Sequence, residues 1–135
     1  MRKKDLKALA SLLIILILGS SIYFIKFKDK PILNRNSIKI IEELTSPNGK
    51  NKAIVYLDNG STTVAENIRV ALIKSKKKSA YESDVVFLQN NSNSIKVEWS
   101  DDNNLLIKYE DNINSEILKY KTKYNKINIL SKKQG

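Results

Sequence analysis

The residue types best suited to bind a ligand follow a glycine near the middle of the chain. Gly60 is followed by Ser61, Thr62 and Thr63, three hydroxyl side chains directly after the turn signal "DNG". Successive backbone amides in a turn can form an anion-binding nest, and hydroxyls add hydrogen bonds to an anion or a glycan. We therefore name these four residues as a candidate binding turn. The alternative is that they only shape the bend between two strands.

A second candidate is a stripe of lysines near the C-terminus. Lys119, Lys121 and Lys123 recur at every second position, and a strand would point them all to one face. Such a face would attract an anionic envelope polymer, lipid headgroups or an acidic protein. Nucleic acid is a poorer fit, because Tyr120 and Tyr124, whose rings would stack on bases, alternate onto the opposite face. The plain alternative is a solvated face whose lysines discourage edge-to-edge aggregation.

Catalytic chemistry is disfavoured because the side chains that most often carry it are missing. The chain has no cysteine and no histidine, which removes thiol nucleophiles, imidazole bases and the commonest zinc ligands. Adjacent carboxylates such as Asp101 and Asp102 would point to opposite faces of a strand rather than converge. Residues 101–104 offer oxygen ligands for calcium but lack the spacing of a calcium loop, so a hairpin turn is the better interpretation. We expect no enzyme, no cofactor and no metal.

The elements that would position these groups begin with a membrane anchor. Residues 8–25 contain no charge, and eighteen helical residues extend about 27 Å, close to the hydrocarbon thickness of a bilayer. An uncleaved anchor is favoured over a cleaved signal peptide, because the apolar run continues through 22–25 and no A-x-A cleavage site follows it. Basic residues flank both sides of the span, so the positive-inside rule gives little asymmetry. A short basic N-terminus ordinarily stays inside, so we expect a single-pass protein of the cytoplasmic membrane with residues 31–135 outside.

After this segment the chain has the pattern of strands. Segments of alternating or continuous apolar character are separated by clusters of Asn, Asp, Ser and Gly, which is typical of an antiparallel β domain. The expected strands are 52–57, 66–74, 84–89, 94–100, 105–109, 116–124 and 126–130, with 37–44 open between strand and short helix. Three parts follow: a basic N-terminus and transmembrane anchor at 1–30, a linker at 31–37 and an antiparallel β domain at 38–135.

The residue types between these strands predict the kind of connection at each place. The "PNG" of residues 47–49 suits a turn in which the glycine takes a positive φ. Segments 100–104 and 110–112 fit hairpin turns, and 74–83 is the longest loop because its successive lysines repel one another. Trp99 is expected in the core rather than as a ligand platform, because the apolar residues two and four positions before it share its face.

The order of several motifs resembles a group of small, uncharacterised bacterial proteins. "SPNGK" at 46–50, "GSTT" at 60–63 and "VEW" at 97–99 match the pattern S-P-[DN]-G-K, G-[AS]-T-T and V-x-W within residues 45–109. The resemblance implies an exported or membrane-anchored β protein and no known activity. Many of those proteins have a cysteine where this chain has Asn59, so no thiol role carries over. Parts of the pattern are also similar to single blades of TolB-like β-propellers, but about 105 residues are too few to close a propeller.

These features predict a mainly β fold, in which one N-terminal transmembrane helix precedes a small antiparallel β-meander, a sandwich or a propeller-blade-like sheet. The formal net charge is +10, but half of it lies in the first thirty residues, which weakens an argument for nucleic acid. We expect a membrane-anchored extracytoplasmic protein that acts by binding an envelope polyanion or a protein. The alternative is an accessory or structural subunit of a membrane complex of transporter, sensor or immunity type. Oligomeric state stays open.

Overall fold

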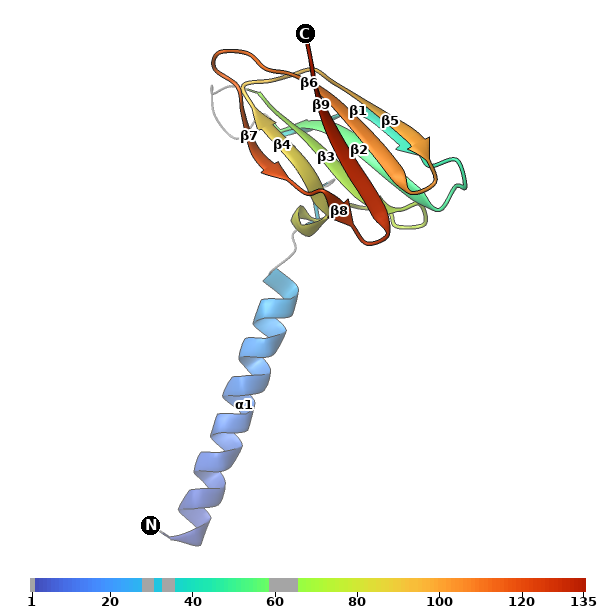
Figure 1. The fold of residues 1–135 in the computed structure, drawn as a ribbon. Helices are drawn as coiled ribbons and strands as arrows, with labels where there is room; N and C mark the ends of the chain where they lie inside the picture. Colours follow the sequence, from blue (N-terminus) through green and yellow to red (C-terminus); the bar gives the residue numbers. More distant parts are fainter. Residues whose placement is uncertain (1, 28–30, 33–35, 59–65) are drawn as a thin grey trace. The chain divides into compact units, whose positions relative to one another are not determined.

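The computed structural model describes residues 2–27, 31, 32, 36–58 and 66–135. The chain divides into two compact units, Met1–Lys30 and Pro31–Gly135. The first unit consists of the helix α1, Lys3–Phe27, and the second is a β domain (Figure 1). The expected mainly β fold with one apolar helix at its N-terminus is therefore confirmed.

Helix α1 has the length and composition of one membrane span. Its segment Lys3–Tyr23 has a mean hydropathy of 2.0, and none of it is buried against other protein atoms. The hydroxyls of Ser11, Ser20 and Ser21 donate to backbone carbonyls one turn earlier, each at 2.9 Å. The polar groups inside the apolar segment are thus satisfied within the helix, as a hydrocarbon environment requires.

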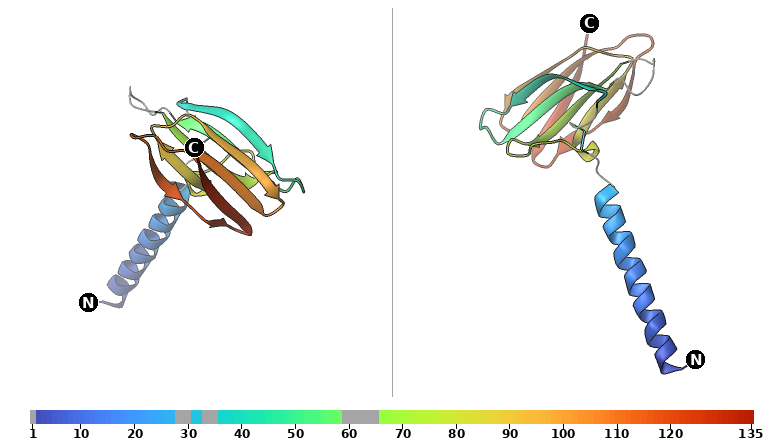
Figure 2. Two further views of the ribbon diagram at one scale, coloured as in Figure 1. Left: turned by 45° about the horizontal axis from the view of Figure 1, so that its top comes forward. Right: turned by 180° about the vertical axis from the view of Figure 1, so that it is seen from behind.

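The β domain is a sandwich of two sheets (Figures 1 and 2). The strands are β1 (Ile38–Thr45), β2 (Asn51–Asp58), β3 (Asn67–Lys74), β4 (Val85–Asn90), β5 (Ile95–Asp101), β6 (Asn104–Glu110), β7 (Glu116–Tyr120), β8 (Lys123–Tyr124) and β9 (Ile127–Gln134), and a 3₁₀ helix, η1, spans Glu82–Asp84. One sheet has five strands in the order β1-β2-β3-β4-β7, and all its neighbours are antiparallel. The other has four strands in the order β5-β6-β9-β8, in which β6 and β9 run parallel.

The space between the sheets is filled by side chains that alternate along the strands. Val55 and Val70 of the five-stranded sheet belong to the same buried cluster as Val97, Leu105 and Ile129 of the four-stranded sheet. This cluster is the main hydrophobic core. Burial of this apolar area is the main driving force that holds the two sheets together.

The central strands of the five-stranded sheet are buried on both faces. Ile54, Tyr56 and Ala71 point away from the main core and form a second buried cluster with Ile32 and Ala80. A strand covered on both faces needs apolar residues at consecutive positions, which explains the unbroken apolar run in β2. The second cluster is covered by the start of the domain and by the connection between β3 and β4.

Two residues of the segment interpreted as a linker are part of this cover. The Ile32 N–H donates to the Ala80 carbonyl at 2.6 Å, and Pro31 pairs with Tyr81 in an isolated β-bridge. Only 1% of the Ile32 surface is exposed. The chain therefore enters the β domain at residue 31, against the β3–β4 connection.

Two local predictions are wrong for one shared reason. The stretch 116–124 is not a single strand, because β7 ends at Tyr120 and β8 belongs to the other sheet. Segment 110–112 is not a hairpin turn, because it starts the connection from β6 to β7, which lie in different sheets. Alternation of polar and apolar residues continues unchanged where a chain crosses between sheets, so the crossings leave no local signal. The ambiguous stretch 37–44 falls in strand β1.

Candidate functional site

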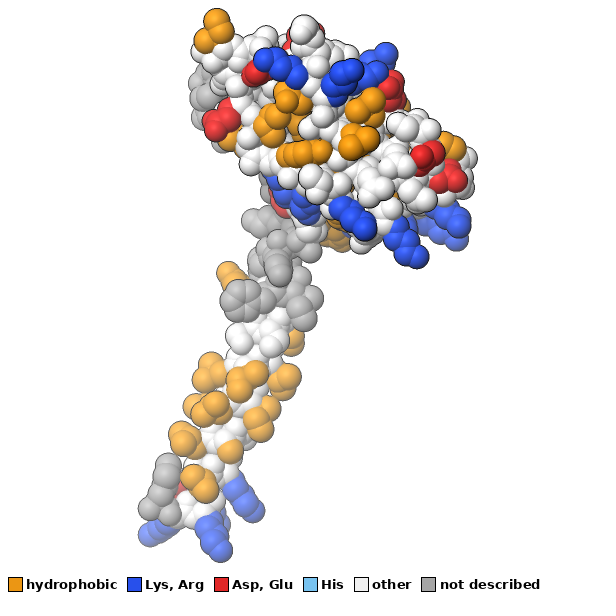
Figure 3. Space-filling view, viewed as in Figure 1, with side chains coloured by type: hydrophobic (Ala, Val, Ile, Leu, Met, Phe, Trp, Pro, Cys, Tyr) orange, Lys and Arg blue, Asp and Glu red, His pale blue; other side chains and the backbone are white. Residues whose placement is uncertain are grey.

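The connections between strands gather at two ends of the sandwich. The basic end is made of segments 46–50, 74–84, 101–104 and 121–126. Of the described residues, Asp58, Glu66 and segments 90–94 and 110–116 make the acidic end. The four segments of the basic end hold eight lysines and four carboxylates, whereas the connecting residues of the acidic end hold five carboxylates. The strand ends beside these carboxylates carry lysines at 39, 96, 108, 132 and 133. Figure 3 shows basic side chains along the lower rim of the β domain, the rim on which β8 lies in Figure 1. The connections at the two ends therefore differ in charge, although basic side chains lie at both ends of the domain (Figure 3).

A cavity of about 440 Å³ opens at the basic end. Three connections, the first residues of β2 and β9 and the last residue of β3 contribute to its lining, which consists of Asn48, Lys50, Asn51, Lys74, Asp102, Asn103, Asn125, Lys126 and Ile127. This volume lies within the range of small-molecule sites. Three lysines, four side-chain amides and one carboxylate make the lining cationic and rich in hydrogen-bonding groups.

The first of these turns is fixed by its own hydrogen bonds. The Gly49 N–H donates to the Ser46 carbonyl at 2.8 Å, and Asn48 Oδ1 accepts from the Ser46 hydroxyl at 2.8 Å and the Lys50 N–H at 3.0 Å. Gly49 has a φ of +73°, so the predicted glycine turn is confirmed. The Ser75 N–H donates to the Lys50 carbonyl at 3.0 Å and joins this turn to the β3–β4 connection.

The second turn confirms the hairpin predicted at 100–104, with two residues between β5 and β6. Asp101 Oδ1 accepts from the Asn103 N–H and from the Asn104 side-chain amide, each at 2.8 Å. These hydrogen bonds, the backbone one first, hold the pKa of Asp101 below its usual value. Asp102 Oδ1 points inward and is buried without a hydrogen-bond partner among the described residues. Asp101 therefore maintains the turn, while Asp102 lines the cavity.

Trp99 ties the two sheets together near this end. Its indole N–H donates to the Leu44 carbonyl at 3.0 Å, which connects β5 with β1 across the sandwich. The ring is partly buried and packs against the main core, as expected from the sequence. The tryptophan thus fixes the distance between sheets whose turns surround the cavity.

Asp84 fastens the β3–β4 connection to the opposite sheet. Its carboxylate accepts from Lys77 Nζ at 2.7 Å, from the Tyr81 N–H at 2.8 Å and from the Tyr124 hydroxyl. Burial alone would raise the pKa of Asp84, but the bonds from Lys77, Tyr124 and Tyr81 outweigh it and hold the pKa below its usual value. The sequence interpretation missed this residue, whose signal is an acidic side chain that opens an apolar strand after a run of lysines.

The predicted lysine stripe is divided between two roles. Lys119 Nζ donates to the Glu82 carbonyl at 3.4 Å and Lys121 Nζ to the Ser83 carbonyl at 3.1 Å, so both hold η1. Burial, together with the nearby Lys121, lowers the pKa of Lys119. Lys123 lies exposed in β8. The three side chains do not project from one strand face.

The other predicted binding turn, Gly60, Ser61, Thr62 and Thr63, lies outside the described residues. Its flanking residues Asp58 and Asn67 pair with each other across β2 and β3 at the acidic end. These two flanking residues lie at the end of the sheet opposite the cavity.

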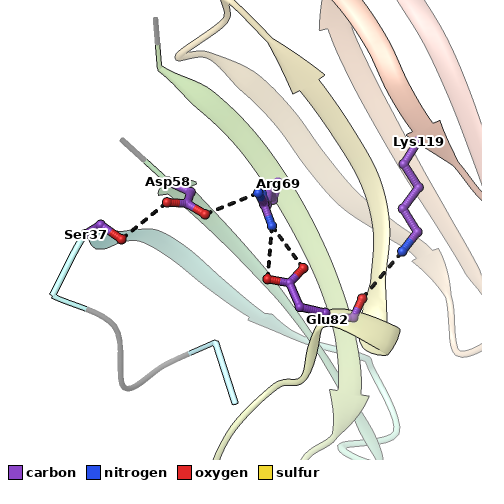
Figure 4. Close-up of polar contacts among 5 residues, drawn as sticks. All are labelled: Ser37, Asp58, Arg69, Glu82 and Lys119. Carbon is purple, nitrogen blue, oxygen red and sulfur yellow. Dashed lines mark hydrogen bonds and ion pairs between the residues drawn. The ribbon is translucent and has the colours of Figure 1, made fainter. Parts of the chain in front are cut away.

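An ion network lies on the outer face of the five-stranded sheet (Figure 4). Arg69 forms ion pairs with Asp58 Oδ2 at 3.2 Å and Glu82 Oε2 at 3.0 Å, and the Ser37 hydroxyl donates to Asp58 Oδ1 at 3.3 Å. Figure 4 shows the guanidinium between the two carboxylates. The charge of Arg69 is thus matched within the protein, and the network fastens η1 to the sheet rather than offering a charge to a ligand.

A buried tyrosine lies in the same cross-strand row as this arginine. Tyr56 pairs with Arg69 in register and is fully buried. Burial raises the pKa of its hydroxyl strongly, and the nearby Arg69 opposes that effect only in part. The phenol is therefore neutral at physiological pH, and it belongs to the second cluster rather than to a reactive site.

Sequence reasoning missed the convergence of the turns on the cavity, although one signal for it exists. In a meander every second connection lies at the same end, so the β1–β2 turn and the β3–β4 connection must share one. The turns at 102–103 and 125–126 join them only because the two sheets pack face to face, which strand patterns do not specify.

Comparison with known proteins gives one match. Residues 2–125 match a family described as a family of unknown function, DUF5412. No curated protein and no solved structure matches the chain.

Proposed function

We propose that this chain, which belongs to the DUF5412 family of unknown function, is a membrane-anchored β-sandwich that acts by binding an anionic ligand. The observation that carries the proposal is the cavity of about 440 Å³ lined by three lysines and four asparagines, where the positive charge exceeds the negative charge of the one carboxylate, Asp102. Phosphate and carboxylate groups accept hydrogen bonds from ammonium and amide donors of this kind. Helix α1 supplies the anchor, and the β domain works outside the cytoplasmic membrane.

The charges of the cavity support this proposal. Among the described residues, no carboxylate forms an ion pair with Lys50, Lys74 or Lys126. Three ammonium groups around one cavity repel one another, and an anion bound between them relieves that repulsion. By contrast, the cationic groups of Arg69 and Lys77 are matched by carboxylates of the protein.

A titration with small anions tests this function. The full chain in nanodiscs of neutral phosphatidylcholine is titrated with glycerol 1-phosphate and with inorganic phosphate, and amide chemical shifts are followed. We expect saturable binding with the largest shifts at the cavity asparagines. A variant with Lys50→Gln, Lys74→Gln and Lys126→Gln loses at least about tenfold in affinity, because charge-assisted hydrogen bonds are removed.

The matched control removes the same number of positive charges from positions outside the cavity. Lys39, Lys96 and Lys132 are exposed and do not line the cavity, so their replacement by glutamine leaves the affinity within about twofold. An equal loss in both triple variants, or no saturable binding of either anion, contradicts a site in the cavity.

A second function, that of an accessory subunit, is favoured by one edge of the sandwich. Strand β1 is at the edge of its sheet and exposes Ile40 by 45% and Ile41 by 47%, next to a bulge between Ile40 and Glu42. Apolar residues on an open edge are a liability unless another chain covers them. Purification of the full chain in mild detergent tests this: a stoichiometric integral partner that is lost in an Ile40→Lys variant supports the accessory role.

A further inference from the structure

We infer that the anion bound at the basic end is a phosphate of anionic lipid headgroups, so that this end of the β domain docks on the bilayer that holds α1. The inference rests on the proposed function, because it names the source of the anion. Three observations carry it: the charge difference between the connections at the two ends, the place where the chain enters the domain, and the exposure of lysines beside the cavity.

The first observation is that the connections at the two ends differ in charge. The eight lysines of the basic end and the five carboxylates of the acidic end lie at opposite ends of the same sandwich. Carboxylates offset the strand-end lysines at the acidic end, so an anionic surface attracts the basic end more strongly and favours that orientation. A uniformly basic domain would lack this preference.

The second observation is that the chain enters the domain beside this end. Pro31 pairs with Tyr81, and the Ile32 N–H donates to the Ala80 carbonyl, so entry is fixed to the lysine-rich β3–β4 connection. Only residues 28–30 separate the last helical residue, Phe27, from Pro31. Four peptide steps extend about 14 Å at most, which keeps the entry point within reach of the headgroups.

The third observation is that further lysines extend the cavity lining outward. Lys76 and Lys78 are exposed, and among the described residues neither forms an ion pair, whereas Lys77 between them is held by Asp84. Lysine near an anionic membrane surface strengthens binding by about fivefold per residue at moderate salt. With the three cavity lysines, five ammonium groups are available to headgroup phosphates.

A depth measurement in nanodiscs tests the docking. The chain has no cysteine, so the exposed Thr122 of the basic end and the exposed Asn114 of the acidic end can each be replaced by a single dye-labelled cysteine. The full chain is placed in discs of phosphatidylcholine alone or of phosphatidylcholine and phosphatidylglycerol, with a quencher on a trace headgroup. We expect stronger quenching at position 122 in the anionic discs, and reversal at 1 M salt, where the Debye length falls to about 3 Å.

Lysine variants quantify the effect. Replacing Lys76 and Lys78 by glutamine shifts the equilibrium away from the docked state by about 25-fold. The matched pair Lys96→Gln and Lys132→Gln, on exposed positions of the four-stranded sheet, leaves quenching at position 122 unchanged. Circular dichroism of each variant confirms that the fold is retained.

The outcomes separate this inference from the proposed function. Quenching at position 122 that is the same in neutral and anionic discs overturns the docking, as does an equal change at positions 114 and 122. If glycerol 1-phosphate still binds in neutral discs, the cavity function stands without the lipid. If anionic lipid changes quenching at position 122 but no soluble anion binds, the docking is supported and is attributed to Lys76 and Lys78. The same result contradicts an anion site in the cavity.

Discussion

The two ends of the sandwich use similar side chains in different ways. At the basic end Asp84 is almost fully buried and is held by three hydrogen bonds from three residues. At the acidic end Asp111 and Lys133 form an ion pair at 2.8 Å between side chains that are 47% and 57% exposed. A carboxylate therefore stabilises the fold substantially only where it is buried and hydrogen-bonded to several partners. An exposed carboxylate contributes mainly to the surface charge.

Among the variants considered, removal of the Asp84 carboxylate is expected to reduce the stability of the domain most. Asp84→Ala leaves Lys77 and the Tyr124 hydroxyl without their buried acceptor, so we expect the free energy of unfolding to fall by about 3 kcal/mol. Asp111→Ala at the acidic end changes it by less than about 0.5 kcal/mol, because water screens the exposed pair. Urea unfolding of the full chain in detergent, followed by the fluorescence of the single tryptophan, measures both. Equal losses in the two variants contradict the distinction.

Protonation of Asp84 at low pH weakens the same hydrogen bonds, and we expect it to lower the free energy of unfolding by less than Asp84→Ala does. The pKa of folded Asp84 lies below its usual value, so the unfolded chain binds that proton more readily than the folded one. Its stabilisation is complete above the unfolded pKa of about 3.9 and is lost as pH falls through the lower folded pKa. Unfolding midpoints measured from pH 6 to pH 2 therefore fall more steeply for the wild type and Asp111→Ala than for Asp84→Ala. Parallel curves for all three proteins would show that Asp84 is not the group responsible.

The smallest of the three effects concerns the link between the sheets. Trp99→Phe keeps an aromatic ring but removes the hydrogen bond to the Leu44 carbonyl, so we expect a loss of about 1 kcal/mol. Tyr109→Phe, a matched aromatic change nearer the acidic end, costs less than about 0.5 kcal/mol, because its ring contact with Phe87 is kept. Thermal unfolding followed by circular dichroism compares the two. A larger loss of stability in Tyr109→Phe than in Trp99→Phe would contradict the role given to the hydrogen bond of Trp99 in joining the sheets.

Local sequence patterns were sufficient to predict the helix, the strands and the turns, but not which of them contact one another. The apolar run of α1, the unbroken run of β2 and the glycine turn at residue 49 are each determined by neighbours in sequence, and each was predicted. The bond from Tyr124 to Asp84 joins residues 40 positions apart. Strand periodicity says which face a side chain takes but not which sheet its strand joins, so neither the lysine positions nor the cavity followed from the sequence.

The crossing at residues 121–122 shows this limit most clearly. Residues 116–124 alternate as one strand would, yet the chain leaves one sheet after Tyr120 and enters the other at Lys123. Lys121 and Lys123 therefore cannot share a strand face with Lys119. The interpretation of the lysines as a stripe depended on a strand that the packing of the sheets divides.

The position of β9 has a consequence for the biosynthesis of the protein. The last strand of the chain, Ile127–Gln134, lies inside its sheet between β6 and β8 rather than at an edge. A nascent chain that has not yet released these residues leaves β6 with an open side and the main core without Ile127 and Ile129. The domain can therefore complete its fold only once residues 127–134 have left the ribosome, and a chain that lacks them exposes an unpaired strand to quality-control proteases.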